Sequence, residues 1–368
     1  MLRLNGRAWA WIGVALATAV VMTGCSHSAT KTAAPAKASP TPHPPHSATP
    51  PPPPPPPPPP TCPLTGVTGG SVPNRPALAI KVENSPDSRP PVGLDAADVI
   101  YEEPVEGGIT RFVVVYQCHD AARVEPVRSI RQADPYLVNQ SGKALFGNAS
   151  GSPPSLEALA SAVRAGWLVD VGYSTGAGYI RDGGRVSPHN LYTSTPALYA
   201  RPDAQGLPQA TPIFTYSASP PPGGPGALVH ANFSAASDVY WHWTPAANAY
   251  QRYYGNAPAT QANGAVLSAQ NIVVQSVPVT MSWWIEDPSG SHQPVPQLLG
   301  KGAALVCRLG TCVSGTWWRP GEGLGQPTYF LDAAGHQIPL TPGNTWVELV
   351  PSSVTGPGAI PVGSFSAS

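Results

Sequence analysis

A run of eleven consecutive prolines, Pro50 to Pro60, constrains this chain more than any other feature. Such a run adopts the polyproline II conformation at about 3.1 Å per residue, which makes it a stiff spacer of roughly 34 Å. The residues before it, from Ser26 onward, are mostly Ala, Ser, Thr, Lys and Pro, with almost nothing to bury. Residues 26–61 are therefore predicted to be a disordered stalk that lifts a globular part off a membrane. A docking site for proline-binding domains is the alternative.

The first 25 residues have the pattern of a bacterial export signal. A basic start is followed by Ala8 to Met22, an uncharged apolar run of 15 residues. That run is short for a membrane-spanning helix, which needs about 20 residues, and it suits a signal peptide. It ends in Val21-Met22-Thr23-Gly24-Cys25, which resembles the lipobox of bacterial lipoproteins. We therefore predict a lipidated (palmitate-bearing) Cys25 that anchors the chain to the outer face of the cell membrane. An ordinary secretory signal with a chance cysteine is the alternative.

The cysteine count agrees with export. Apart from Cys25 there are four cysteines, Cys62, Cys118, Cys307 and Cys312, and an even number is typical of disulfides in an oxidising compartment. A Gly-containing turn between two strand-like runs separates the last two, so we expect a bridge across that hairpin. This leaves Cys62 to pair with Cys118. Metal binding is the alternative, but no CxxC motif or paired His accompanies these residues. We predict no metal and no cofactor.

The balance of charge excludes some classes of partner. The chain has 20 basic and 20 acidic residues and a formal net charge of zero. This excludes a polybasic nucleic-acid-binding protein and an acidic solvating tail. Charged residues make up 11% of the 368 residues, less than half the usual share of about 25%, so a dense cluster of charges is informative. The 49 Pro and 37 Gly also exclude a chain built mostly of long helices.

The predicted fold class is α+β, with a mixed α/β domain at residues 62–218. Its β-like runs are 77–83, 97–102 and 109–116. Two helices are expected, one from Asp134 to Gly142 and one from Ser152 to Gly166. Each has a proline in its first turn and ends at a glycine. The expected apolar face of the second helix is made of Leu156, Leu159, Ala160 and Val163.

A Pro/Gly-rich segment, Ser219 to Ala227, is the predicted domain boundary, although it also fits a long surface loop within one domain. Beyond it the helix signals fade, and apolar runs are spaced like antiparallel strands. Residues 228–352 are therefore predicted to form a mainly antiparallel β domain, and residues 353–368 a flexible tail.

Three charged segments of the first half, 101–111, 125–131 and 185–190, would form one cleft if folding brings them together. The members of this cleft would be Glu102, Glu106, Arg111, Arg128, Arg131 and His189. Two carboxylates about 5 to 9 Å apart suit glycosidase acid–base chemistry, and a His beside a carboxylate suits a general base. Glu102, Glu106 and His189 are thus the candidate catalytic residues.

The same segments also suit binding without catalysis. Arginines bind carboxylates or phosphates through two parallel hydrogen bonds, so the candidate ligand-binding residues are Arg111, Arg128, Arg131 and Asn190. The other interpretation is an internal salt-bridge network in which Glu102 and Glu106 neutralise Arg128 and Arg131. We favour such a network, or a non-catalytic ligand site, over catalysis.

Aromatic residues are concentrated in the second half, several of them as adjacent pairs. One member of each pair is predicted to face the core and its neighbour to face outward. Exposed Trp and Tyr with few charges suit sugar stacking or a protein interface, and packing in the β core is the interpretation we favour. These residues are Trp241, Trp243, Tyr250, Tyr253, Tyr254, Trp283, Trp284, Trp317, Trp318 and Trp346.

Several motifs resemble the YerB-like bacterial lipoproteins. They include Glu106-Gly-Gly-Ile-Thr-Arg111, Pro126-Val-Arg128-Ser-Ile-Arg131 and Ser187-Pro-His189-Asn190-Leu-Tyr192, and the match covers most of residues 74–200. The second half, ending in Gly343-Asn-Thr-Trp346-Val, is similar more loosely. The resemblance implies a tethered extracytoplasmic protein of two domains. It implies no reaction, because the family is known chiefly as domains of unknown function.

These observations together predict a lipid-anchored binding or scaffold protein of the bacterial cell envelope. Its arginine-rich cleft would bind an anionic or glycan group, and its partners would be the membrane, the cell-wall glycan or an envelope protein. The alternative is a cell-wall glycan hydrolase that uses Glu102 or Glu106 with His189.

Overall fold

The computed structural model describes residues 58–368. The predictions for residues 1–57, which are the signal peptide, the lipidated Cys25 and most of the stalk, lie outside the described residues. Among the residues that are described, no helix has the length and apolar character needed to cross a membrane.

The first half of the chain contains short strands and the α-helices of the described part. Its elements are β1 (Leu78–Glu83), β2 (Val99–Pro104), β3 (Thr110–Tyr116), α1 (Asp134–Val138), β4 (Ala144–Gly147), α2 (Pro153–Arg164), β5 (Leu168–Asp170), β6 (Tyr179–Arg181), β7 (Leu191–Thr193) and α3 (Thr195–Tyr199). The strands follow β-branched and aromatic runs, which pack well on a pleated surface.

The second half is built from strands. They are β8 (Gly224–Pro225), β9 (Leu228–Ser234), β10 (Ser237–Thr244), β11 (Ala249–Tyr254), β12 (Ala257–Pro258), β13 (Ser268–Ala269), β14 (Asn271–Ile285), β15 (His292–Pro296), β16 (Gly300–Arg308), β17 (Thr311–Arg319), β18 (Tyr329–Leu331), β19 (Thr345–Thr355) and β20 (Ser364–Ala367). The protein is therefore a mixed α+β protein, as predicted, in which strands dominate.

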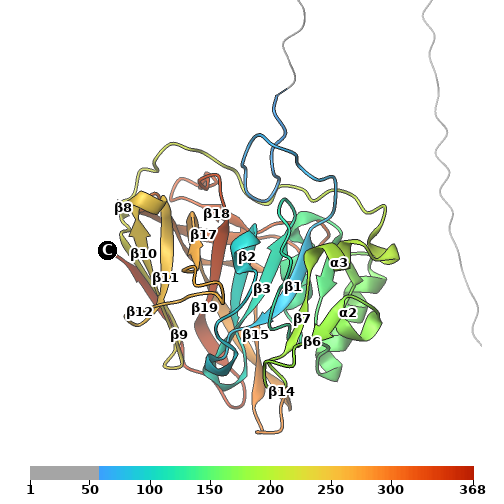
Figure 1. The fold of residues 1–368 in the computed structure, drawn as a ribbon. Helices are drawn as coiled ribbons and strands as arrows, with labels where there is room; N and C mark the ends of the chain where they lie inside the picture. Colours follow the sequence, from blue (N-terminus) through green and yellow to red (C-terminus); the bar gives the residue numbers. More distant parts are fainter. Residues whose placement is uncertain (1–57) are drawn as a thin grey trace, which may run out of the picture. The chain divides into compact units, whose positions relative to one another are not determined.

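Both halves contribute to one mixed sheet of 12 strands, whose main order is β18-β17-β16-β14-β19-β2-β3-β1-β4-β5. Strand β19 comes near the end of the sequence but lies at the centre of this sheet. It is parallel to β14 on one side and to β2 on the other. Figure 1 shows the smaller sheet and the helices on opposite sides of this large sheet. The two halves are thus joined by continuous backbone hydrogen bonding.

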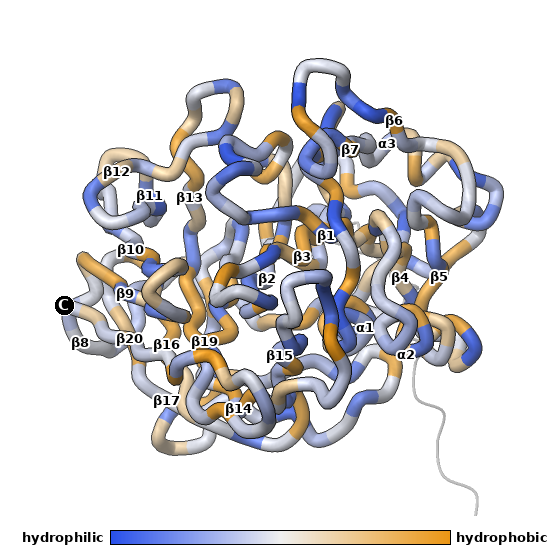
Figure 2. The backbone as a smooth tube through the Cα atoms, turned by 90° about the horizontal axis from the view of Figure 1, so that it is seen from below, coloured by the Kyte–Doolittle hydropathy of each residue, from blue (hydrophilic) through white to orange (hydrophobic). Residues whose placement is uncertain are grey.

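The large sheet is buried on both faces. A smaller sheet of order β12-β11-β10-β9-β20 covers one face, where Trp241 packs edge-to-face on Trp346, with ring centroids 4.9 Å apart. Helices α1 and α2 cover the other face through Leu137 and Leu159. Seen from below, hydrophobic segments follow β14 and β19 (Figure 2). We call these two sides the small-sheet face and the helix face.

The ends of α2 confirm the prediction, but its buried side is rotated by about one residue. The helix begins at Pro153 after Ser152 and is followed by Gly166, whose φ of 76° suits glycine. The buried residues are Ser155, Leu159 and Ala162 rather than the full predicted face, and Val163 is exposed. The buried Ser155 has a polar partner there, because Gln293 of β15 donates a hydrogen bond to its hydroxyl at 3.1 Å.

The flexible tail predicted for residues 353–368 is wrong. Strand β19 continues to Thr355, and β20 pairs antiparallel with β9. The exposed edge of β9 offers backbone N–H and C=O groups that any segment can pair with, whatever its side chains. The predicted boundary segment also takes part in the sheet, since Gly224–Pro225 pairs with β17.

Both predicted disulfides are present. Cys62–Cys118 joins the segment before β1 to the residues after β3, and its Cα atoms lie 6.0 Å apart. Cys307–Cys312 links directly paired residues of β16 and β17. The turn between these strands has Leu309 and Gly310 at φ values of 52° and 71°, as a tight hairpin requires.

Candidate functional site

Charged residues lie on both faces of the large sheet where β1, β2 and β3 pair. Successive side chains of a strand point to opposite faces, so the adjacent Glu102 and Glu103 of β2 face different cores. Glu103 is paired with Arg111 of β3, which in turn is paired with Glu83 of β1. This register places a row of three charged residues on the helix face.

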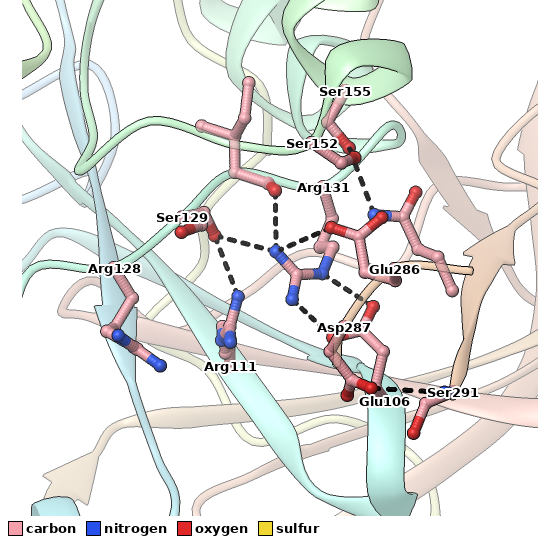
Figure 3. Close-up of polar contacts among 12 residues, drawn as sticks. Glu106, Arg111, Arg128, Ser129, Arg131, Ser152, Ser155, Glu286, Asp287 and Ser291 are labelled. Carbon is pink, nitrogen blue, oxygen red and sulfur yellow. Dashed lines mark hydrogen bonds and ion pairs between the residues drawn. The ribbon is translucent and has the colours of Figure 1, made fainter. Parts of the chain in front are cut away.

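An arginine cluster, formed by Arg111, Arg128 and Arg131, extends this row (Figure 3). Arg131 is held by carboxylates: its Nε donates to Glu106 Oε1 at 2.7 Å, its Nη2 contacts the other oxygen of Glu106, and its Nη1 lies 3.6 Å from Glu286. Burial opposes the charge of Arg131, but these carboxylates raise its pKa. Arg131 and Glu106 are therefore a buried ion pair, as the network interpretation predicted for these two residues.

Arg111 differs from its neighbour because it has no carboxylate partner. Its side chain donates one hydrogen bond, from Nη1 to the Ser129 carbonyl oxygen at 3.1 Å, as Figure 3 shows. Its Nε has no hydrogen-bond partner among the described residues, and none of their carboxylates lies within ion-pair distance of it. Arg111 is nevertheless only 7% exposed. Burial and the nearby Arg131 lower its pKa to about 10, so it remains charged at neutral pH.

The outer part of the cluster is partly open to solvent. One oxygen of Glu83 lies 3.2 Å from Arg128 Nε in an ion pair, and the other lies 2.8 Å from His189 Nδ1. The side chains of Arg128 and His189 are each 22% exposed, whereas Glu83 is buried. A solute would therefore meet Arg128 and His189 before it reached Arg111.

The cluster lies at the carboxyl ends of parallel strands. β1 is parallel to β4, so Glu83 and the loop that follows Gly147 are at the same end of the sheet. The segment carrying the arginines is bonded between them, since Arg128 N–H donates to the Lys81 carbonyl at 2.9 Å and Ala149 N–H donates to the Arg128 carbonyl at 3.0 Å. In open α/β sheets this is the end where ligands bind.

A buried triad lies further along the same face. Lys81 Nζ contacts Glu103 and donates to Asp134 Oδ1 at 2.8 Å, and all three side chains are inaccessible to solvent. Burial and the neighbouring Asp134 raise the pKa of Glu103 to about 8, although Lys81 opposes this shift. The triad fixes the first turn of α1 to β1 and β2.

On the small-sheet face, Glu102 belongs to a different cluster. Arg252 of β11 lies 2.6 Å from Glu102 and 3.1 Å from Glu348 of β19, and all three side chains are fully buried. Thr110 donates to Glu102 at 2.5 Å, and Trp241 Nε1 donates to Glu348 at 2.7 Å. This cluster joins the two sheets through charge as well as through apolar packing.

The predicted grouping of six residues in one cleft is therefore wrong for Glu102. Glu106, Arg111, Arg128, Arg131 and His189 gather on the helix face, while Glu102 is separated from them by the sheet. The network interpretation, in which Glu102 and Glu106 neutralise Arg128 and Arg131, was also wrong for Glu102, because it pairs with Arg252. Glu102 and Glu106 consequently do not face one substrate, so they do not form the paired carboxylates of a glycosidase.

Asn190 lies beside the cluster but its side chain is already engaged. Its Oδ1 accepts from Arg181 at 2.9 Å, and its Nδ2 donates to the Asp182 carbonyl at 3.3 Å. No group of three or more His, Cys, Asp and Glu side chains in residues 58–368 is arranged to hold a metal ion.

Sequence reasoning missed several buried charges, namely Lys81, Glu103, Asp134, Arg252, Glu286 and Glu348. A usable signal existed for some of them. Lys81 lies within Ala77-Leu-Ala-Ile-Lys-Val, and Glu348 lies within Thr345-Trp-Val-Glu-Leu-Val350. A lone charge inside an apolar strand must be paired when it is buried. Which residue pairs with it depends on the topology.

Comparison with known proteins finds similarity over most of the chain. The family described as "Protein of unknown function (DUF3048)" matches with its N-terminal domain at residues 64–208 and its C-terminal domain at residues 229–347. The chain is 29% identical over 299 residues to the Bacillus subtilis (strain 168) protein named "Putative lipoprotein YerB", and the alignment covers 78% of this chain and 86% of that protein. The crystal structure of the YerB protein from Bacillus subtilis has a similar fold, with a TM-score of 0.66 and 23% identity, over 83% of this chain and 99% of that one.

Proposed function

Because the chain belongs to the YerB-like family of two-domain DUF3048 proteins, we propose that it is a lipid-anchored extracytoplasmic protein that binds an anionic ligand at its arginine cluster. The proposed organisation is a signal peptide at residues 1–25, a stalk at 26–61 and two domains at 62–218 and 228–352. The ligand would carry a carboxylate or phosphate group of the cell envelope.

Three independent features support the location. The sequence before Cys25 resembles a lipobox, and the Bacillus subtilis relative is named as a lipoprotein. The two disulfides suit an oxidising compartment outside the cytoplasm. Acylation with more than one chain would give stable attachment to the membrane.

The observation that carries the binding proposal is the buried Arg111 without a carboxylate partner. A guanidinium has five N–H donors, and Arg111 uses one of them on a carbonyl oxygen. A buried charge that lacks a counter-ion is costly, and a bound carboxylate or phosphate would remove that cost. Arg128 and His189, at the solvent side of the cluster, would supply further donors to the same anion.

The test is the melting temperature of the chain from Ser26 onward, measured against inorganic phosphate and against lactate as a carboxylate probe. We expect one of them to raise it, since a ligand at 100 times its Kd adds about 2.7 kcal/mol. Arg111→Met should weaken that binding at least tenfold. The matched control is Arg164→Met, an arginine that is 62% exposed and lies on the outside of α2. Unchanged binding in Arg111→Met, or no response of the unsubstituted chain to either anion, would contradict the proposal.

A further inference from the structure

A second candidate site, whose lining includes none of the three arginines of the cluster, lies between α2 and the β14–β15 hairpin. It is a groove of about 850 Å³, which is within the range of sites for small organic ligands. Helix α2 forms one wall with small side chains, including Ala158 and Ala162, and the hairpin and the residues after β15 form the other. Figure 2 shows α1, α2 and β15 side by side on the underside of the molecule.

Four aromatic side chains line this groove: Tyr136, Trp167, Trp283 and Trp284. Tyr136 and Trp167 are in edge contact, with ring centroids 6.1 Å apart, and Trp283 and Trp284 are nearly perpendicular at 5.7 Å. Trp283 is 83% exposed, more than any other tryptophan in the described part of the chain. Two ring pairs from distant parts of the sequence thus face one groove.

A β-bulge presents the tryptophan pair. β14 and β15 are in register up to Met281 opposite Pro294 and resume at Ile285 opposite His292, so residues 282–284 oppose the single residue Gln293. The bulge is held by the Ser282 hydroxyl, which donates to the Trp284 carbonyl at 2.8 Å and accepts from Gln293 N–H at 2.8 Å. Bulges re-aim side chains and recur next to functional sites, which accounts for two adjacent tryptophans lining the same groove.

The polar groups of the groove define the charge of its ligand. They are Gln132, Glu157, Ser161, Gln297 and Glu322, and its lining contains no Lys, Arg or His. Glu322 lies close enough to Tyr136 to raise the pKa of that phenol, together with burial. An anion would be repelled here, whereas amide, hydroxyl and carboxylate oxygens would accept hydrogen bonds from hydroxyl groups.

We propose that this groove binds a neutral glycan chain. A sugar ring has apolar C–H faces and a rim of hydroxyl groups, so it matches aromatic rings that alternate with uncharged and acidic hydrogen-bonding groups. A purely apolar segment would cover the side chains of Gln132 and Glu322 without offering them hydrogen bonds, which is unfavourable. An acidic polymer would meet the carboxylate of Glu322 and would find no cation to bind in the lining, and Glu157 is already paired with Arg164 at the edge of the groove. This site is separate from the arginine cluster and does not depend on the proposed anion binding.

The experiment is calorimetric titration of the full lipidated chain, kept in a detergent that carries no sugar, with chitohexaose and with maltohexaose. We expect saturable binding of at least one of these neutral oligosaccharides. Trp283→Ala should weaken that binding at least tenfold, because it removes the most exposed ring of the groove while leaving the buried side of β14 intact. Polygalacturonate, an acidic glycan, should bind more weakly than the neutral probes.

Trp318→Ala is the matched control. Trp318 is also a strand tryptophan with large exposure, 43%, but its ring packs against Tyr329, in a tilted arrangement outside the groove. Equal losses in the two variants, or no heat from either neutral oligosaccharide at millimolar concentration, would overturn the proposal. Arg111→Met should leave glycan binding unchanged, so failure of one site is distinguishable from failure of the other.

Discussion

Replacing Arg252 by methionine is expected to lower the free energy of unfolding by about 3–5 kcal/mol, because it leaves two buried carboxylates without a cation. Glu102 and Glu348 lie 2.6 and 3.1 Å from the Arg252 guanidinium, in a site with no solvent access. Burial alone would lower the pKa of Arg252, but the two carboxylates raise it above its usual value. Burial and the proximity of Glu102 raise the pKa of Glu348.

The measurement is urea denaturation of the chain from Ser26 onward, followed by tryptophan fluorescence. Arg164→Met is the control, since its partner Glu157 is also exposed and surface pairs of this kind contribute about 0–1 kcal/mol. A triple variant that also carries Glu102→Gln and Glu348→Gln should recover part of the loss, because the unpaired charges are then absent. If Arg252→Met unfolded at the same urea concentration as Arg164→Met, the cluster would not hold the two sheets together.

The second large effect is a fall in stability as the pH rises from about 5 to 8. The pKa of Glu103 is raised to about 8 in the folded protein, above its value of about 4.3 in an unfolded chain. The folded state therefore holds a proton that the unfolded state has released. The stabilisation from this group is complete below the unfolded pKa and is lost as the pH rises through the folded one. One such group gives a slope of up to about 1.4 kcal/mol per pH unit.

The comparison that checks this is Glu103→Gln, measured by urea denaturation at a series of pH values. The variant should show a flatter dependence between pH 5 and 8, because a glutamine at this position does not titrate. The pKa of Glu348 is also raised, so Glu348 makes stability fall with pH in both the variant and the unsubstituted chain. The informative quantity is therefore the difference between the pH slopes of the two proteins. Glu157→Gln is the control, since this exposed carboxylate pairs with Arg164, which lowers its pKa instead of raising it. Equal slopes in the Glu103 variant and the unsubstituted chain would contradict the assignment.

Local signals in the sequence predicted much of the fold. A proline in the first turn and a glycine after the last turn predicted where α2 begins and ends. The spacing of Cys307 and Cys312 predicted the hairpin disulfide. The prediction that adjacent aromatic residues face opposite ways was also correct for Trp317, which is buried, and Trp318, which is exposed. These features depend on neighbouring residues alone, so they can be read without knowing the topology.

The clusters of charge were harder to predict because their members come from distant strands. Strand alternation separates Glu102 from Glu103, yet the cation that meets Glu102 is Arg252, in the other half of the chain. The arginine cluster was predicted because its three members lie in two short segments, but Glu286, the distant carboxylate near Arg131, was not predicted. The tail prediction was wrong for a related reason. β20 is only four residues long, and its partner β9, on whose side Phe365 and Ala367 pack against the core, is distant in the sequence.

The central position of β19 has a consequence for the order in which the protein can assemble from its N-terminus. The strands β1, β2 and β3 come early in the chain, but the edge of β2 remains unpaired until residues 345–348 are available. Until then β14 also lacks its parallel neighbour. Unpaired edges of this kind invite association with other chains, and non-local parallel pairing is slow. The early disulfide between Cys62 and Cys118 can close before this step, because both cysteines precede α1, and so it ties the waiting N-terminal strands together.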